Sequence, residues 1–168
     1  MAFPKKLKNF TAFVDGHGYA GKVTELTLPK LTLKTEEYRA GGMDLPVEIE
    51  MGMEKLEAEL TFAEYDPNLF KLFGLVDGGA VRLTLRGAAR ADDVEAQSIV
   101  VNLEGLFREM DSGSWKAGDE ATLKVAVAAR FYKLTIDGVE MIEIDAENMV
   151  RKIEGVDQLA GIRSALAQ

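Results

Sequence analysis

The chain has 168 residues, no cysteine and a single histidine, and its 20 basic and 28 acidic side chains give a net charge of −8. The length predicts one domain over residues 1–168, and the acidic balance argues against a surface that neutralises nucleic-acid phosphates. The absence of cysteine excludes disulfides, thiolate nucleophiles and cysteine-ligated zinc. Because the single histidine, His17, also leaves little scope for imidazole chemistry, most hydrolytic and metal-dependent mechanisms lack their usual residues, and we expect no catalytic residue, no cofactor and no metal site. No apolar run approaches the ~18 residues of a membrane span, so we expect no membrane anchor and synthesis in the cytoplasm.

The first motif along the chain is Gly16-His17-Gly18-Tyr19-Ala20-Gly21, after a strand-like run at 10–14. It matches the dinucleotide fingerprint G-x-G-x-x-G, which requires a helix N-terminus directly afterwards to hold the pyrophosphate. Residues 22–29 are instead β-rich and end in proline. The motif therefore predicts a hairpin turn opened by Asp15-Gly16, with His17 as a solvated loop residue.

Alternation of apolar and polar residues dominates the rest of the chain and predicts half-buried strands. A glycine-containing break at 52–54 makes the strands predicted at 45–53 and 55–62 either a hairpin or one bulged strand. Asp137-Gly138 predicts a two-residue hairpin turn, and 77–79 predicts another turn. The predicted strands are 30–38, 45–53, 55–62, 81–89, 98–110, 120–136 and 139–144.

Two short helices are predicted. Asp66 is a good N-cap, Pro67 fits the first helical position and Gly74 follows the end, which predicts a helix at about 67–73. Apolar residues from Val156 to Leu166 recur at helical spacing and predict a helix at about 155–166. About eight strands with two helices favour a mainly β protein, an antiparallel β-sandwich or barrel with helical additions.

Acidic residues concentrate between Asp44 and Glu64, where the only basic residue is Lys55. The alternation puts Glu48 and Glu50 on one side of their strand, and Glu57 and Glu59 on one side of theirs. Like charges on neighbouring strands cost stability. Such a face is either an ordinary solvated surface or a negatively charged surface that has a function.

Two further acidic stretches, 111–115 and 140–145, could supply paired carboxylates or a calcium site. Neither has EF-hand spacing. A turn explains 111–115 better, and a solvated strand face explains 140–145 better.

Trp115, in a glycine-flanked loop, is expected to anchor that loop or to lie at an interface. The long strands 98–110 and 120–136 expose unpaired backbone unless the sheet closes or pairs with another chain, and a ring or tube is one solution.

Several strings along nearly the whole chain resemble those of one family, in the same order. The strings are Tyr38-Arg39-Ala40-Gly41-Gly42-Met43-Asp44 with Pro46 and Met51-Gly52, then Trp115-Lys116-Ala117-Gly118, Tyr132-Lys133-Leu134 before Asp137-Gly138, and Gly155-Val156-Asp157-Gln158-Leu159-Ala160-Gly161. They resemble the major tail tube proteins of contractile-tailed bacteriophages, a group that includes the tubes of R-type pyocins.

The resemblance implies a structural protein without catalysis. Its subunits would form hexameric rings, stacked into the inner tail tube, and would complete a shared β-barrel around the lumen. Sheath contraction would drive the tube through the host envelope, so that DNA follows or, in a pyocin, only depolarisation of the host. The implied partners are further copies of the chain, the tail sheath, the tape-measure protein, and the baseplate and tail terminator proteins. The implied location is the virion tail, after assembly in the host cytoplasm.

The resemblance also implies roles for particular residues. An extended arm at about 38–62 would reach neighbouring subunits, and the C-terminal helix would lie toward the outside of the ring. We hypothesise that four carboxylates, Glu48, Glu50, Glu57 and Glu59, face the lumen and repel DNA. The expected inter-subunit residues of the arm are Tyr38, Arg39, Gly41, Gly42, Met43, Asp44, Met51 and Met53.

Two alternatives stay open at this point. One is a ring-forming tube protein of a secretion system, such as the haemolysin-coregulated protein of type VI secretion. The other is a monomeric ligand-binding β-barrel, which would leave the acidic strand faces unexplained.

Overall fold

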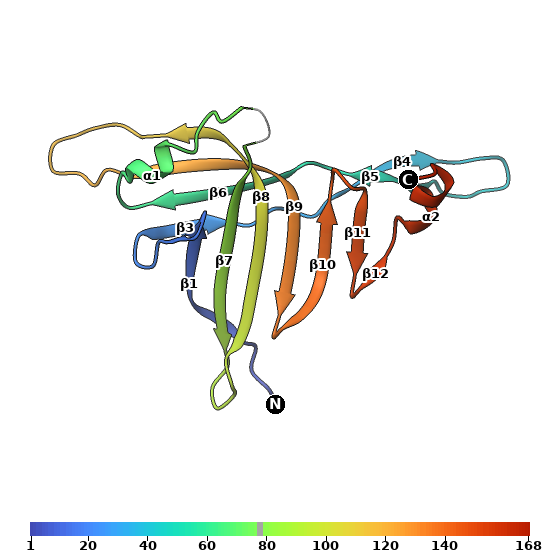
Figure 1. Ribbon diagram of the computed structural model, residues 1–168. Helices are drawn as coiled ribbons and strands as arrows, with labels where there is room; N and C mark the ends of the chain where they lie inside the picture. Colours follow the sequence, from blue (N-terminus) through green and yellow to red (C-terminus); the bar gives the residue numbers. More distant parts are fainter. Residues whose placement is uncertain (77–78) are drawn as a thin grey trace.

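Two long strands, β8 (Gln97–Asp111) and β9 (Leu123–Ile136), run through both layers of a β-sandwich in the computed structural model (Figure 1). The structure describes residues 1–76 and 79–168, so most of the turn predicted at 77–79 lies outside the described residues. The two strands pair antiparallel along almost their whole length. Each strand therefore belongs to one sheet at one end and to the other sheet at the other end.

The first half of β8 and the second half of β9 belong to the larger sheet. This sheet has the order β12-β11-β10-β9-β8-β7-β1-β2. Its other strands are β1 (Lys6–Val14), β2 (His17–Gly18), β7 (Val81–Arg90), β10 (Val139–Asp145), β11 (Val150–Ile153) and β12 (Val156–Asp157).

The opposite halves of the same two strands complete a four-stranded layer, which we call the crossing sheet. Its order is β3-β6-β9-β8, with β3 at Val23–Thr27 and β6 at Leu56–Phe62. Its strands run across the direction of β1, β7 and β10 (Figure 1). A third, separate sheet consists of β4 (Leu33–Tyr38) and β5 (Val47–Met53).

The hydrophobic core fills the space between the two layers. The alternation of β6 buries Leu60 and Phe62, and that of β9 buries Val125 and Val127 against them. Tyr19 packs edge-to-face on Phe62 with 5.2 Å between the ring centroids. Burial, with a smaller contribution from the nearby Asp66 carboxylate, raises the pKa of Tyr19 to about 12. These contacts join the turn after β2 to the centre of the sandwich.

Gly105 marks the place where β8 leaves one layer for the other. The β8–β9 register shifts between Glu104 and Gly105. A Cβ atom at Gly105 would overlap the carbonyl oxygen of Ala128 and would lie 2.8 Å from the Cα of Ala129. The crossing of the two strands therefore requires a residue without a side chain at this position.

The structure confirms the predicted turns at Asp15-Gly16 and Asp137-Gly138. Both connect antiparallel strands directly, and both aspartates have positive φ, +47° and +49°. His17 is exposed in the short strand β2, and the strand β3 follows the glycine motif instead of a helix. The structure therefore offers no helix N-terminus at the G-x-G-x-x-G motif.

The predicted pairing of 45–53 with 55–62 is wrong. β5 pairs with β4, whereas β6 pairs with β3 and β9 in the crossing sheet. The backbone N–H of Glu54 donates to the carbonyl of Thr32 at 2.8 Å, so the chain leaves the β4–β5 sheet at this point. Within the expected arm of 38–62, residues 56–62 lie in the body of the protein.

Both helices are shorter than predicted. α1 (Pro67–Phe70) begins at the Asp66 cap, whose carboxylate accepts from the N–H of Asn68 at 2.9 Å. α2 (Ala160–Ala165) begins late because 150–157 forms β11 and β12, with a turn at Gly155. No helix in residues 1–76 or 79–168 is long and apolar enough to cross a membrane.

The close approach at Gly105 gives a first prediction. Gly105→Ala should lower the free energy of unfolding by about 3 kcal/mol, because the new methyl group meets backbone that cannot move without breaking the β8–β9 ladder. Gly161→Ala is the matched control: open space surrounds Gly161 within α2, and alanine should stabilise the helix by up to about 1 kcal/mol. Urea denaturation of both variants measures the difference. Equal midpoints would show that the crossing tolerates a side chain.

Candidate assembly surfaces

The β4–β5 sheet is separate from the other strands and projects from the body (Figure 1). Every residue of β4 is exposed, and so are the first five residues of β5. An isolated two-stranded hairpin is marginally stable in water. We call this segment, residues 33–53, the projecting hairpin.

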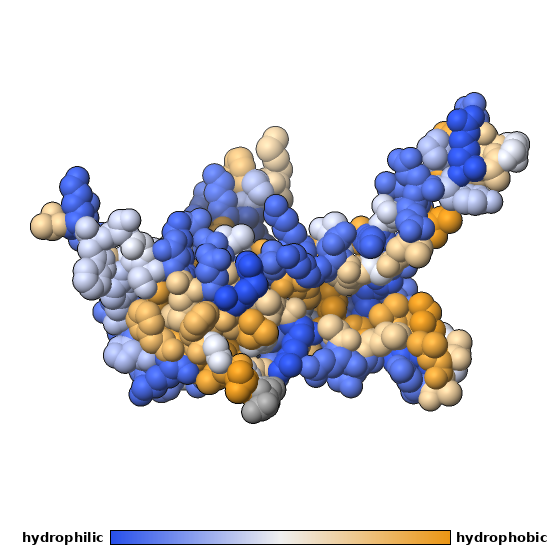
Figure 2. All heavy atoms as spheres, turned by 90° about the horizontal axis from the view of Figure 1, so that it is seen from above, coloured by the Kyte–Doolittle hydropathy of each residue, from blue (hydrophilic) through white to orange (hydrophobic). Residues whose placement is uncertain are grey.

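One face of the projecting hairpin is largely apolar. Tyr38 lies opposite Val47, and Ile49 lies opposite Glu36, so these side chains share a face. Tyr38, Val47 and Ile49 are 53%, 45% and 45% exposed. Figure 2 shows apolar residues among hydrophilic ones along this segment, at the upper right. The alternation of 45–53 was expected to give a half-buried strand, but the single chain leaves its apolar side uncovered.

The opposite face of the hairpin is acidic. Glu37 lies directly across from Glu48, and Thr35 lies across from Glu50. Like charges at directly opposed positions destabilise a strand pair. The projecting hairpin thus combines an exposed apolar strip with charge repulsion, which is typical of a segment that is stabilised by contact with another chain.

The connecting loop at the tip of the hairpin carries most of the expected arm residues. Arg39 Nε donates to the carbonyl oxygen of Met43 at 3.2 Å, and Gly42 has a φ of +87°. Gly41 and Asp44 lie in the same loop, whereas Met51 and Met53 lie on β5 toward the body. The structure brings these residues onto one hairpin, and their contact with another subunit stays a prediction.

At the base of the hairpin, Glu50 contacts the body. Its Oε1 atom accepts from the N–H of Gly52 at 3.0 Å and lies 2.9 Å from Nη1 of Arg151 on β11. The hydrogen bond from Arg151, followed by that from Gly52, lowers the pKa of the Glu50 carboxyl from its usual value. Sequence reasoning missed Arg151, which is 101 residues away from Glu50.

The four predicted lumen carboxylates occupy two different sheets. Glu48 and Glu50 lie on the projecting hairpin, whereas Glu57 and Glu59 lie on the outward face of the crossing sheet, opposite Ala128 and Ala126. Glu57 Oε1 is 3.2 Å from Nζ of Lys55 and 3.7 Å from Nη2 of Arg108. The structure therefore does not unite the four carboxylates on one hairpin.

In residues 1–76 and 79–168, the crossing sheet has a strand with an open edge at each side. Among the described residues, β3 pairs with β6 alone. In the same part of the chain, β8 beyond Gly105 has β9 on one side and, on the other, a single bridge between Phe73 and Phe107. Each of the two outer strands presents backbone N–H and C=O groups that another strand can pair with.

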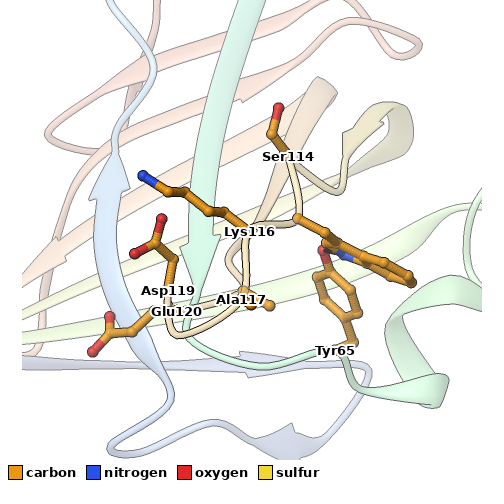
Figure 3. A pocket seen from close by; sticks show the side chains of 8 residues that line it. Tyr65, Ser114, Lys116, Ala117, Asp119 and Glu120 are labelled. Carbon is orange, nitrogen blue, oxygen red and sulfur yellow. Dashed lines mark hydrogen bonds between the residues drawn. The ribbon is translucent and has the colours of Figure 1, made fainter.

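An aromatic pocket lies at the end of the crossing sheet, next to α1. Trp115 Nε1 donates to the Tyr65 hydroxyl at 3.0 Å, and that hydroxyl donates to the carbonyl oxygen of Ser112. Tyr65 lies on one side of the pocket, with Lys116, Asp119 and Glu120 on the other (Figure 3). Trp115 is 82% exposed and tethers its loop by this hydrogen bond.

Comparison with known proteins identifies the family. The family model for phage tail tube protein FII matches residues 4–166. The chain belongs to this family. It is 36% identical to the tail tube protein of Escherichia phage P2 over 163 residues, which cover 95% of each chain. It is 34% identical to the major tail tube protein of Serratia phage KSP20 over 157 residues, 92% of this chain and 91% of that protein.

Solved structures share the fold of this tail tube protein. A chain of the sheath-tube complex of an extracellular contractile injection system has a TM-score of 0.59 and 15% identity, over 79% of this chain and 92% of that one. A chain of the tube-terminating cap of the anti-feeding prophage has a TM-score of 0.60 and 13% identity, over 82% and 93%. The relatives in the family are structural tail tube proteins, and this tail tube protein is a component of the virion tail.

The apolar strip of the projecting hairpin gives a second prediction. Ile49→Lys should abolish self-association of the chain at concentrations at which the wild type associates, because it puts a charge between Tyr38 and the rest of the strip. The free energy of unfolding of the dilute monomer should change by less than about 0.5 kcal/mol, since Ile49 is exposed there and the new lysine lies opposite Glu36. Sedimentation velocity with negative-stain microscopy measures assembly, and urea denaturation measures stability.

Val139→Lys is the matched control, with the same change from an exposed apolar residue to a charge on β10, outside the hairpin. It should still associate. If Ile49→Lys associated normally, or if both variants failed equally, the apolar strip would not be the contact surface.

Proposed function

We propose that this tail tube protein forms the inner tube of a contractile tail, in which six copies close into a ring and the rings stack. The observation that carries this proposal is the pair of unpaired strands on opposite sides of the crossing sheet, β3 and the second half of β8. The proposal covers the hexameric ring, the shared barrel, the residues that line it and the neighbours of the tube.

The direction of the strands favours ring closure. The four strands of the crossing sheet alternate in direction, because β3–β6, β6–β9 and β9–β8 are all antiparallel. β3 and β8 therefore run in opposite directions. A second copy placed side by side in the same orientation brings its β3 next to the first copy's β8, and the antiparallel alternation continues. Such a head-to-tail contact closes into a ring when the rotation between copies divides a full turn.

Six copies with four strands each would give a barrel of 24 strands. Barrels of about 16–18 strands already enclose an aqueous channel, and the diameter grows with strand number. The barrel would leave no unpaired edge at the lumen wall. The projecting hairpin would cover its apolar strip on neighbouring copies, and the core between the two layers would lie outside the lumen wall.

The outward face of the crossing sheet would become the wall of the lumen. Within the four strands, the register and the contact of Arg108 with Glu57 place five acidic and two basic residues on this face, a net charge of −3 per subunit. Lys55, directly before β6, also pairs with Glu57. A negative wall would repel DNA phosphates, so that DNA passes without being bound. We propose this role for Glu57 and Glu59, and we assign Glu48 and Glu50 to the hairpin. The acidic residues are Glu25, Glu57, Glu59, Glu109 and Asp111, and the basic residues are Arg108 and Lys124.

The neighbours of the tube follow by analogy. Structures with the same fold come from a sheath-tube complex, a sheath/tube terminator and a baseplate. We propose that this chain likewise contacts a sheath, a terminator and a baseplate, and that the tape-measure protein occupies its lumen during assembly in the host cytoplasm. The unpaired strands of the crossing sheet argue against a monomeric ligand-binding barrel, and the family match favours a phage tail over a secretion system.

Cross-linking tests the ring directly, because the chain has no cysteine. A variant with Glu25→Cys on β3 and Glu109→Cys on β8, treated with a short bis-maleimide after assembly, should give a ladder of covalent species that ends at six subunits on a denaturing gel. The two single-cysteine variants should stay monomeric, since the contact joins different edges. Dimers from a single variant, or a ladder that ends at another number, would contradict the proposed ring.

The charge of the lumen wall gives a separate prediction. Tubes of the double variant Glu25→Lys with Glu59→Lys should retain short duplex DNA on sedimentation at low salt and release it at high salt, because the charge of the four strands on the wall changes from −3 to +1 per subunit. Wild-type tubes should retain none. Asp92→Lys with Glu95→Lys makes the same charge change in the exposed loop between β7 and β8 and should behave like the wild type. DNA retention equal in the two double variants would place Glu25 and Glu59 outside the lumen.

A further inference from the structure

We propose that Arg151 is a positioning residue that sets the direction of the projecting hairpin, so that the hairpin meets a second copy of this chain at a fixed angle. The inference rests on the proposed function, because the hairpin needs a fixed direction only where another copy has to receive it. The evidence is the ion pair between Arg151 and Glu50, the pocket beside it and the bracing of Arg151 by the C-terminal segment.

The base of the hairpin is built to bend. The β4–β5 register shifts between Leu33 and Thr35, and Gly52 opposite this shift has a φ of +102°, a conformation that favours glycine. Bulges of this kind turn and twist a strand pair locally. The two chain connections at the base therefore do not by themselves fix the direction of the hairpin.

Packing at the base leaves space. A pocket of 380 Å³ separates the hairpin base from the C-terminal part of the chain. Apolar side chains, which cannot fix an angle through directional bonds, contribute much of its lining. They include Met53 and Leu56 on one side and Ile144, Val150 and Leu159 on the other.

The Glu50–Arg151 ion pair spans this base. The contact joins two charged groups at hydrogen-bond distance, and the Arg151 side chain is only 15% exposed. A hydrogen bond between ionised partners is stronger and more directional than one between neutral groups. Because Oε1 of Glu50 also accepts from the N–H of Gly52, the bend and the ion pair share one carboxylate oxygen.

Arg151 is itself held in place by the C-terminal segment. It lies opposite Ile144 in the β10–β11 ladder, and its carbonyl oxygen accepts from the N–H of Gln158 at 2.7 Å. Arg163 on α2 donates to the carbonyl of Met149 at 2.7 Å and pairs with Asp157. The turn before β11, the strand β12 and α2 are thus tied together, and they present Arg151 from a braced support.

A fixed hairpin lowers the cost of assembly. A hairpin that samples many directions loses that freedom when it binds, which weakens the contact, whereas a preorganised one does not. In a ring, six hairpins have to meet their receiving surfaces together, so the effect repeats at every contact. The ion pair acts before assembly, in the single chain.

The test compares variants that break and restore the ion pair. Glu50→Gln and Arg151→Met should each raise the critical concentration for tube formation about tenfold, measured by light scattering and negative-stain microscopy. Combining them should add little, because both remove the same contact. The exchanged pair, Glu50→Arg with Arg151→Glu, should recover part of the wild-type assembly, because it restores the ion pair but not the acceptor for the N–H of Gly52. A spin label on Asp44→Cys should show faster motion of the hairpin tip in the two single variants than in the monomer with the ion pair intact.

Glu140→Gln is the matched control. It removes the ion pair with Lys133, which has a nitrogen–oxygen distance of 2.7 Å and joins β9 to β10 away from the hairpin. It should change neither the critical concentration nor the spin-label motion. Wild-type assembly by Glu50→Gln, or no recovery in the exchanged pair, would overturn the positioning role. A wild-type chain that gives no six-subunit ladder would instead contradict the proposed ring.

Discussion

Unsatisfied strand edges are the constraint on which the rest of this structure depends. In the part of the chain that the structure describes, the crossing sheet has four strands, and both of its outer strands offer backbone groups to a further strand. Such an edge invites pairing, and natural proteins normally cover or charge it. Here the even number of antiparallel strands makes the two edges complementary to each other, so repetition of the same chain is the economical way to satisfy them.

The second layer makes this open sheet possible. β8 and β9 pass through both layers, and the bend at Gly105 lets the same two strands contribute to each. The core between the layers is filled by the inward side chains of the crossing sheet and the larger sheet. The outward face of the crossing sheet therefore does not pack against the core. It can carry small and charged residues such as Ala126, Ala128 and Glu59.

Sequence patterns predicted the strands better than their partners. Alternation identified β6, β7, β8 and β9 because each buries one side, and the Asp-Gly pairs placed two turns. Alternation does not say which strand lies alongside, so the pairing of 45–53 with 55–62 was wrong. It also does not say whether the apolar side is covered by the same chain, which is why Val47 and Ile49 looked half-buried. The C-terminal spacing fitted a helix, but a turn at Gly155 and pairing with β11 took Val156 and Asp157 into a strand.

Contacts between distant residues left no mark in the sequence. Arg151 is one of 20 basic residues, and nothing in its neighbourhood indicates that it meets Glu50. The acidic run from Asp44 to Glu64 was visible, but its residues divide between the hairpin and the crossing sheet only once the chain is folded. The sequence shows where acidic residues concentrate along the chain. Which of them share a surface depends on strand pairing and register, which the sequence pattern does not give.

The charge on the outward face of the crossing sheet would affect both DNA passage and subunit contacts in a tube. A positive wall would hold DNA through its phosphates, and a strongly negative wall would make neighbouring subunits repel one another at the very edges that must pair. On the outward face of the crossing sheet, Arg108 lies beside Glu57, and Lys124 lies opposite Asp111 in the strand register. These basic residues reduce the excess of carboxylates without reversing it. In the proposed ring, the basic residues would therefore reduce repulsion between subunits, while the remaining excess of carboxylates on the four strands would still repel phosphates.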